Sequence, residues 1–235
     1  MTIYGNSANE HSFRNDITNQ TVNNPPNVKI EIPKEGTKLK ANSSVRYRVV
    51  VTDKEDGSTE FGEILPNEVV LELTCWPSKK AATDYKNLTK DIAKEPTGLT
   101  VIKHAGCFNC HNDKARLTGP SFEDIAIRYK NDPTAIHTLA KNVITGSTGI
   151  WGDVQMPSNP ELSKIEVIQA VEYILKQGNN QRSRIYNGYE GVIWPIKQAI
   201  DDNPCVYVLT TSYTDKGKGG VSGTELRAQH SILLN

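Results

Sequence analysis

The chain has 235 residues, which is enough for one large domain or two small ones. Its 27 Lys and Arg residues balance its 27 Asp and Glu residues, so net charge gives no reason to expect a nucleic acid or an anionic membrane surface as partner. The sequence contains no apolar run long enough to span a bilayer, so no transmembrane segment is predicted.

Strand-like alternation dominates the first third of the chain. Residues 1–26 are rich in Asn, Ser and Thr and end in two prolines, so they are predicted to be a flexible or extended lead-in. From Val28 onward apolar and polar residues alternate, and the same period of two returns at 45–51 and 69–73. Turns with Gly and Asp separate these segments, which predict an antiparallel sheet.

Helical signals replace this alternation between about residues 84 and 178. Ser121 with Asp124, and Ser163 with Glu166, have the spacing of capping boxes at helix starts. A proline after Asp132 marks another start. Helices are predicted over residues 97–110, 122–130, 133–145 and 164–177.

A polar linker is predicted at 179–203, and strand-like segments return at 206–215 and 226–234. Two strands cannot make a stable domain alone, and the strands before the helices are also a thin core. Joined together, they would form a β-sandwich of about seven strands with the helical block inserted in one connection.

Cys107-Phe-Asn-Cys110-His111 is a Cys-x-x-Cys-His motif, the attachment signature of c-type haem. In such a site both thiols are bonded to the porphyrin, and the histidine binds iron through an imidazole nitrogen. One covalent haem c is therefore the predicted cofactor, with His111 as an iron ligand. Because this attachment implies maturation outside the cytoplasm, we expect a periplasmic or extracellular protein. The start, Met1-Thr-Ile-Tyr-Gly, lacks the basic and apolar regions of a signal peptide, so we expect a mature or excised part of a longer exported chain.

The other two cysteines are predicted to form a disulfide. Cys75 follows Val69, Leu71 and Leu73 in steps of two, so it is expected on the same inward face of the strand. By the same spacing, Cys205 is expected on the same face as Tyr207 and Leu209 of the returning strand. Both thiols would then point into the sandwich, and an oxidising compartment favours their pairing. The alternative is two free, buried cysteines that behave as small apolar residues.

Met156 is the predicted second iron ligand. Apart from Met1 it is the only methionine, and its surroundings are rich in Gly, Pro and polar residues, where a gap-filling core methionine is unexpected. A thioether is a soft ligand suited to haem iron. His137 is the only serious competitor.

Residues 97–178 resemble the class I cytochrome c family in four features that occur in order. The Cys-x-x-Cys-His motif is followed by Leu117-Thr-Gly-Pro-Ser-Phe122, which is similar to the family's Gly-Pro-x-Phe segment. Gly149-Ile-Trp-Gly-Asp-Val-Gln-Met-Pro157 is similar to the Gly-x-Trp-Gly…Met-Pro loop of small bacterial cytochromes, and an amphipathic helix closes the block. The resemblance implies His111 and Met156 as the axial pair.

The same resemblance implies further pocket roles. The carbonyl of Pro120 would accept a hydrogen bond from the proximal histidine. Trp151 would either donate to a haem propionate or pack over the haem edge without that bond. Phe122, with Ile125 and Tyr129 at helical spacing, would wall the haem, although ordinary helix packing selects the same residues.

The flanking β segments resemble PKD/cadherin-type immunoglobulin-like domains. The similar stretches are Asn24-Pro-Pro-Asn-Val-Lys-Ile, Val49-Val-Val-Thr-Asp-Lys-Glu-Asp-Gly57 and Val206-Tyr-Val-Leu…Tyr-Thr-Asp-Lys-Gly217. The implied fold class is α+β multidomain, an all-α class I cytochrome c domain at 84–178 inserted into an Ig-like antiparallel β-sandwich formed by 27–78 and 204–235.

An acidic run in this β region has two interpretations. Asp53, Glu55 and Asp56 are candidate calcium ligands, as in cadherin-like loops. The alternative is a solvated turn.

The whole combination resembles the C-terminal region of bacterial secreted PQQ-dependent sugar dehydrogenases of the glucose/sorbosone type. It implies an electron carrier rather than an enzyme, which takes electrons from a dehydrogenase domain or partner and passes them to a cytochrome or an oxidase. One alternative is a haem enzyme or gas sensor with an exchangeable axial position. Another is a carbohydrate-binding β module that carries a cytochrome.

Overall fold

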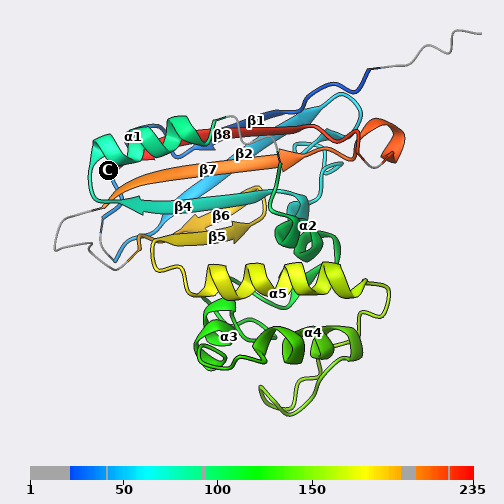
Figure 1. The fold of residues 1–235 in the computed structure, drawn as a ribbon. Helices are drawn as coiled ribbons and strands as arrows, with labels where there is room; N and C mark the ends of the chain where they lie inside the picture. The colour runs from blue at the N-terminus through cyan, green and yellow to red at the C-terminus, as the bar shows by residue number, and fades with distance from the viewer. Residues whose placement is uncertain (1–21, 41, 91–93, 197–204, 222) are drawn as a thin grey trace, which may run out of the picture.

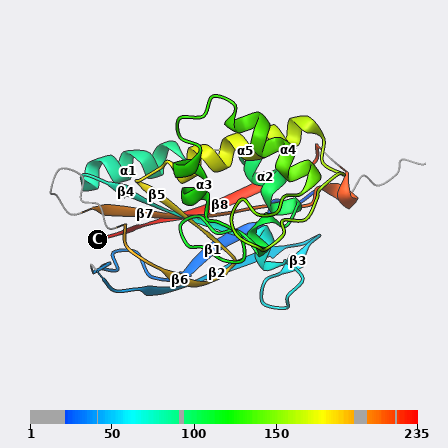
Figure 2. The ribbon, with the colours of Figure 1, turned by 90° about the horizontal axis from the view of Figure 1, so that it is seen from below.

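The computed structural model describes residues 22–40, 42–90, 94–196, 205–221 and 223–235. Two four-stranded antiparallel sheets form adjacent layers, and the helices lie on the side of one sheet that faces away from the other (Figures 1 and 2). Among the residues described, no helix combines the length and apolar character that a membrane-spanning segment requires.

The first sheet is built around β2, which pairs with β1, β3 and β6. Its strands are β1 (Asn27–Ile32), β2 (Val45–Asp53), β3 (Gly57–Ser58) and β6 (Glu190–Ile193). The second sheet has the order β5-β4-β7-β8. Its strands are β4 (Val70–Trp76), β5 (Ser183–Asn187), β7 (Val206–Thr214) and β8 (Arg227–Leu234).

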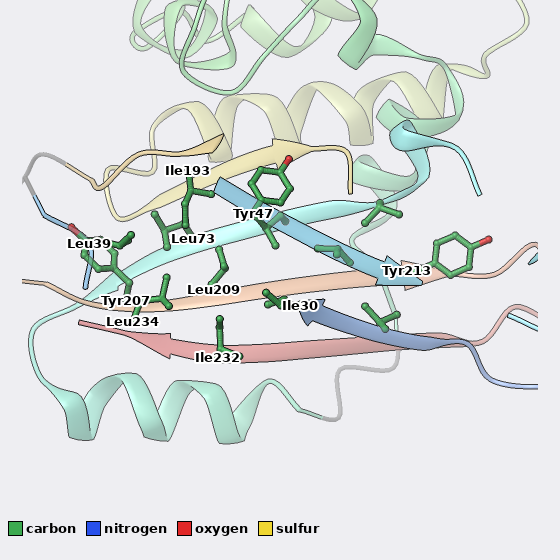
Figure 3. Close-up of a cluster of buried hydrophobic side chains, with 14 of the residues drawn as sticks. Ile30, Leu39, Tyr47, Leu73, Ile193, Tyr207, Leu209, Tyr213, Ile232 and Leu234 are labelled. Carbon is green, nitrogen blue, oxygen red and sulfur yellow. The ribbon is translucent and has the colours of Figure 1, made fainter. Parts of the chain in front are cut away.

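Alternate side chains of both sheets fill the space between them (Figure 3). On β2 these are Tyr47, Val49 and Val51, and the alternation follows from the period of two along a strand. On β7 Leu209 and Tyr213 are fully buried in the same cluster. The apolar alternation of the sequence therefore marks the face on which this core forms.

A disulfide joins the second sheet at the two ends of the intervening segment, as predicted. Cys75 near the end of β4 is bonded to Cys205, which directly precedes β7, and their Cα atoms are 5.3 Å apart. Cys75 is buried in the core between the sheets, and Cys205 packs against it half-buried. The inward parity of the two residues accounts for this pairing.

The helices lie between β4 and β5 in the sequence. They are α1 (Lys79–Leu88), α2 (Thr97–His104), α3 (Phe122–Arg128), α4 (Ala135–Thr145) and α5 (Lys164–Gly178). Short 3₁₀ turns lie at Pro66–Glu68, Cys107–Asn109 and Lys218–Gly220. The predicted capping boxes at Ser121 and Ser163 are both formed, and they begin α3 and α5.

The predicted helix over 97–110 ends early. α2 stops at His104, and Gly106 follows with a φ of 66°. A left-handed residue ends a helix because the backbone can no longer continue the right-handed turn, and glycine adopts it at little cost. The haem motif then starts in a 3₁₀ turn at Cys107 instead of inside the helix.

The predicted fold class, an all-α class I cytochrome c domain inserted into an Ig-like β-sandwich, is wrong. The helices are not packed separately from the sheets, because Val70 of β4 and Ile185 of β5 belong to the same buried cluster as Ile102 and Phe122. The strands also differ from the predicted set of about seven. Residues 179–203, expected to be a linker, contain β5 and β6, and each of these joins a different sheet.

The acidic run after β2 forms a turn. Oδ1 of Asp53 accepts hydrogen bonds from the amides of Glu55 and Asp56 at 2.8 and 2.7 Å, and Oδ2 of Asp56 accepts from Tyr213 Oη at 2.7 Å. Within the described ranges, no group of three or more His, Cys, Asp or Glu side chains is placed to hold a metal ion. The hydrogen bonds to Asp53 show that the run forms a turn.

Candidate haem-binding site

Most of the residues selected from the sequence meet at one pocket in the helical segment. The pocket has an empty volume of about 1130 Å³, counting the part open to solvent. The predicted site residues that line it are Cys107, Cys110, His111, Pro120, Met156 and Trp151. The rest of the wall is largely apolar, with contributions from Val101, Ile125, Leu139, Val143, Val171 and Ile174.

Phe122 lies outside this lining. Its side chain is fully buried behind the proximal histidine, with ring centroids 6.5 Å apart from His111 and 5.8 Å from Phe108. It therefore supports the histidine from the core side. Tyr129 and His137 do not line the pocket either.

The two motif cysteines are held by a single tight turn. The amides of Cys110 and His111 both donate to the carbonyl of Cys107, at 3.2 and 2.9 Å. Both thiols are free and half-buried, and burial raises the pKa of Cys107 to about 11. The turn thus presents two thiols and an imidazole to one cavity.

The orientation of His111 is fixed by a hydrogen bond to Pro120. Its Nδ1 lies 2.7 Å from the carbonyl oxygen of Pro120, and because a carbonyl can only accept, Nδ1 carries the proton. Burial lowers the pKa of His111, although the bond to Pro120 opposes that shift. The side chain is therefore a neutral imidazole with Nε2 unprotonated, which is the form that binds a metal.

Met156 reaches the pocket on a short hairpin. Its amide and carbonyl both bond to Ser147, at 2.9 and 3.1 Å, and this pair forms an isolated β-bridge. Between them Gly149 and Gly152 have φ values of 81° and 111°, which suit glycine and reverse the chain. The hairpin places both Met156 and Trp151 in the pocket wall.

Two arginines hold the tip of this hairpin, and the sequence motifs gave no signal for them. Arg116 donates to the carbonyl of Trp151 at 2.6 Å, and Arg128 donates to the carbonyl of Ile150 at 2.9 Å. The guanidinium of Arg128 also lies over the indole ring of Trp151, 4.7 Å from its centroid. Only the folded arrangement of α3 and the hairpin reveals this contact.

These residues fit a covalently attached haem. A neutral imidazole and a thioether are the donor set of a His/Met haem iron, and they share one apolar cavity whose wall carries two free thiols. Cys107 and Cys110 would hold the porphyrin, and His111 and Met156 would hold the iron.

No family model matches the chain. Cytochrome c-551 of Azotobacter vinelandii is 35% identical over 79 residues, which cover 34% of this chain and 95% of the relative. Cytochrome c2 of Rubrivivax gelatinosus is 36% identical over 82 residues, covering 34% of this chain and 96% of the relative. Among solved structures, Nitrosomonas europaea cytochrome c552 is 31% identical, covers 33% of this chain and 96% of that chain, and has a TM-score of 0.33.

These relatives are small cytochromes, matched over nearly their whole length by about one third of this chain. The match agrees with the pocket that the motif cysteines, the proximal histidine and the hairpin methionine share. The chain therefore belongs to the class I cytochrome c family, and its cofactor is one covalently bound haem c.

Proposed function

We propose that this protein is a single-haem electron carrier with His111 and Met156 as the axial ligands. The observation that carries the proposal is their presence in one pocket with both motif thiols. When bound, haem c supplies a one-electron change between ferric and ferrous iron. Pro120 orients the imidazole, and the hairpin bridge to Ser147 holds the thioether in place.

A second axial position held by Met156 would argue against a haem enzyme or gas sensor. Such proteins need a coordination site that substrate or gas can enter. Met156 belongs to a hairpin that is closed by two backbone hydrogen bonds and held at its tip by two arginines. This arrangement supports a carrier in which both ligands stay in place.

For partners, we propose a dehydrogenase of the PQQ-dependent sugar type as electron donor, and a cytochrome or an oxidase as acceptor. The residues outside the cytochrome match would then connect the haem module to the donor. A periplasmic or extracellular location is part of the same proposal. The disulfide between Cys75 and Cys205 supports it, because disulfides persist in oxidising compartments.

Substitution of Met156 tests the axial assignment. In the haem-loaded protein, Met156→Ala should abolish the far-red sulfur–iron charge-transfer band and allow carbon monoxide to bind the reduced form rapidly. His137→Ala is the matched control, because His137 was the competing ligand and does not line the pocket. An unchanged band in Met156→Ala, or its loss in His137→Ala, would refute the assignment.

A further inference from the structure

A buried carboxylate lies two residues after the proximal histidine. Asp113 is 1% exposed, and its Oδ2 accepts a hydrogen bond of 2.9 Å from the amide of Ile185 in β5. The same oxygen lies 3.5 Å from Nε2 of Gln177 in α5. The second oxygen, Oδ1, is buried and has no hydrogen-bond partner in the described part of the chain. Burying a carboxylate with one oxygen unpaired is unfavourable, so Asp113 adds little to stability by its burial alone.

The next residue is attached to the same region. Nζ of Lys114 donates to the carbonyl of Gly178 at 3.2 Å and to that of Asn180 at 3.1 Å, where α5 ends and the chain turns into β5. It also pairs with Glu123 of α3 at 3.4 Å. A cation near the last carbonyls of a helix is favourable. Two consecutive residues thus anchor the segment after the haem motif to the junction of α5 and β5.

The main chain of the segment is fixed on its other side. The amide of Phe122 donates to the carbonyl of Asn112 at 2.9 Å, and the amide of Glu123 donates to the carbonyl of Asp113 at 3.1 Å. These bonds close the loop that carries Pro120, whose carbonyl accepts the hydrogen bond from Nδ1 of the proximal imidazole. A shift of Asp113 would therefore be transmitted to the hydrogen bond that orients the ligand.

Side-chain contacts continue from this anchor into the second sheet. Nε2 of Gln177 also lies 3.3 Å from Oγ of Ser183, and that hydroxyl donates to Glu72 of β4 at 2.7 Å. β5 is the edge strand of this sheet and lies next to the helical segment (Figure 1). The segment that follows the haem motif is thus joined to two strands through a polar network.

We propose that Asp113 is a positioning residue through which β5 sets the orientation of His111 at the iron. This inference rests on the proposed ligation by His111, and it adds a second function to the β region: the sheet edge is part of the support of the axial ligand. The acceptor geometry of the carboxylate, rather than its contribution to folding, is the property that matters.

The test compares variants of the haem-loaded 235-residue chain by electron paramagnetic resonance of the ferric state, whose g-values report axial-ligand geometry. Asp113→Ala removes the acceptor and should shift the g-values, whereas Asp113→Asn keeps an acceptor oxygen and should restore them. Asp215→Ala is the matched control, since Asp215 is also buried and accepts from the amides of Gly217 and Leu226, outside the pocket lining.

Three outcomes would each overturn the inference. Asp113→Ala could keep the wild-type g-values, Asp215→Ala could shift them equally, or Asp113→Asn could behave like Asp113→Ala. If Asp113→Ala does not fold, Asp113→Glu decides, because one added methylene displaces the loop from β5 and should shift the g-values. The spectrum of the wild-type protein distinguishes failure of the proposed electron-carrier function from failure of the role proposed for Asp113. Absence of a low-spin His/Met signal there refutes the function, whereas a normal signal with unresponsive variants refutes only this inference.

Discussion

At Gly119 the main chain runs against the edge of the His111 ring. A Cβ atom built at this position would lie 2.5 Å from Cε1 of the imidazole and 2.9 Å from Nδ1. These distances are shorter than any normal contact, so a side chain here would displace the ring that Pro120 orients. The residue before the proline therefore has to be small for the ligand to keep its place.

We expect Gly119→Ala to weaken iron ligation and to cost about 1–3 kcal/mol of stability, as overpacking usually does. Visible spectra of the ferric protein and chemical denaturation would measure the two effects. Gly62→Ala is the control, because its φ of 73° adds strain while a Cβ meets nothing within 4 Å. Spectra that change equally in both variants, or in neither, would contradict the steric explanation.

Single residues of this site differ in how far the sequence predicts them. The spacing of Cys107, Cys110 and His111 is fixed, because a single turn has to place two thiols for the bonds to the porphyrin and one imidazole for the iron. Met156 stands out because a thioether is unexpected among Gly and Pro. Asp113 gives no such signal, because its partner is the amide of a strand more than 70 residues away in the sequence.

Helices and strands, like single residues, are predictable where their signal is local in the sequence. The strand at 45–53 alternates clearly because one of its faces meets the core between the sheets, whereas the strand at 206–214 is buried on both faces along most of its length. β6 was missed because the first three of its four residues are exposed, which leaves no alternation to detect. The starts of α3 and α5 are well predicted, since a capping box is local, whereas α1, at Lys79–Leu88, was not predicted. The sharing of one core by helices and strands is not local, and the predicted separate all-α domain failed for that reason.

One side-chain hydrogen bond connects an edge strand of each sheet. Nδ1 of His230 in β8 accepts from the amide of Ile30 in β1 at 3.1 Å. An acceptor nitrogen must be unprotonated, and burial lowers the pKa of His230 below its ordinary value, with Lys86 acting in the same direction. The contact between the sheets is therefore made by the neutral imidazole.

This contact predicts a loss of stability in mild acid. Because the pKa of His230 is lower in the folded chain, the unfolded chain binds the proton first as pH falls through about 6.5, and stability decreases from there downward. His230→Asn keeps an acceptor oxygen and should flatten the dependence of the unfolding free energy on pH between about 7 and 5. His104→Asn, an exposed histidine of α2, controls for the removal of one histidine. An equally steep dependence in His230→Asn would refute the assignment.

The segment between β4 and β7 contains helices α1 to α5 and the pocket, and the disulfide closes it at its base. The covalent link spans a sequence separation of 130 residues. It lies in the core between the sheets, whereas the pocket lies in the helical segment and includes neither Cys75 nor Cys205 in its lining. The link and the haem site should therefore be separable by mutation.

The double variant Cys75→Ala/Cys205→Ala tests this separation. A loop of this length corresponds to at most about 5 kcal/mol of chain entropy, and native disulfides typically contribute about 2–5 kcal/mol, so we expect a loss in that range. The segment between the cysteines keeps structure of its own through α5 and its neighbours, which favours the lower end. Chemical denaturation measures the loss, and the ferric spectrum should keep its far-red band. Substitution avoids a reductant, which would also reduce the iron. If the band disappeared while the protein stayed folded, the sheet core and the ligand pocket would be one cooperative unit, and the support of His111 would reach beyond the β5 edge into the core between the sheets.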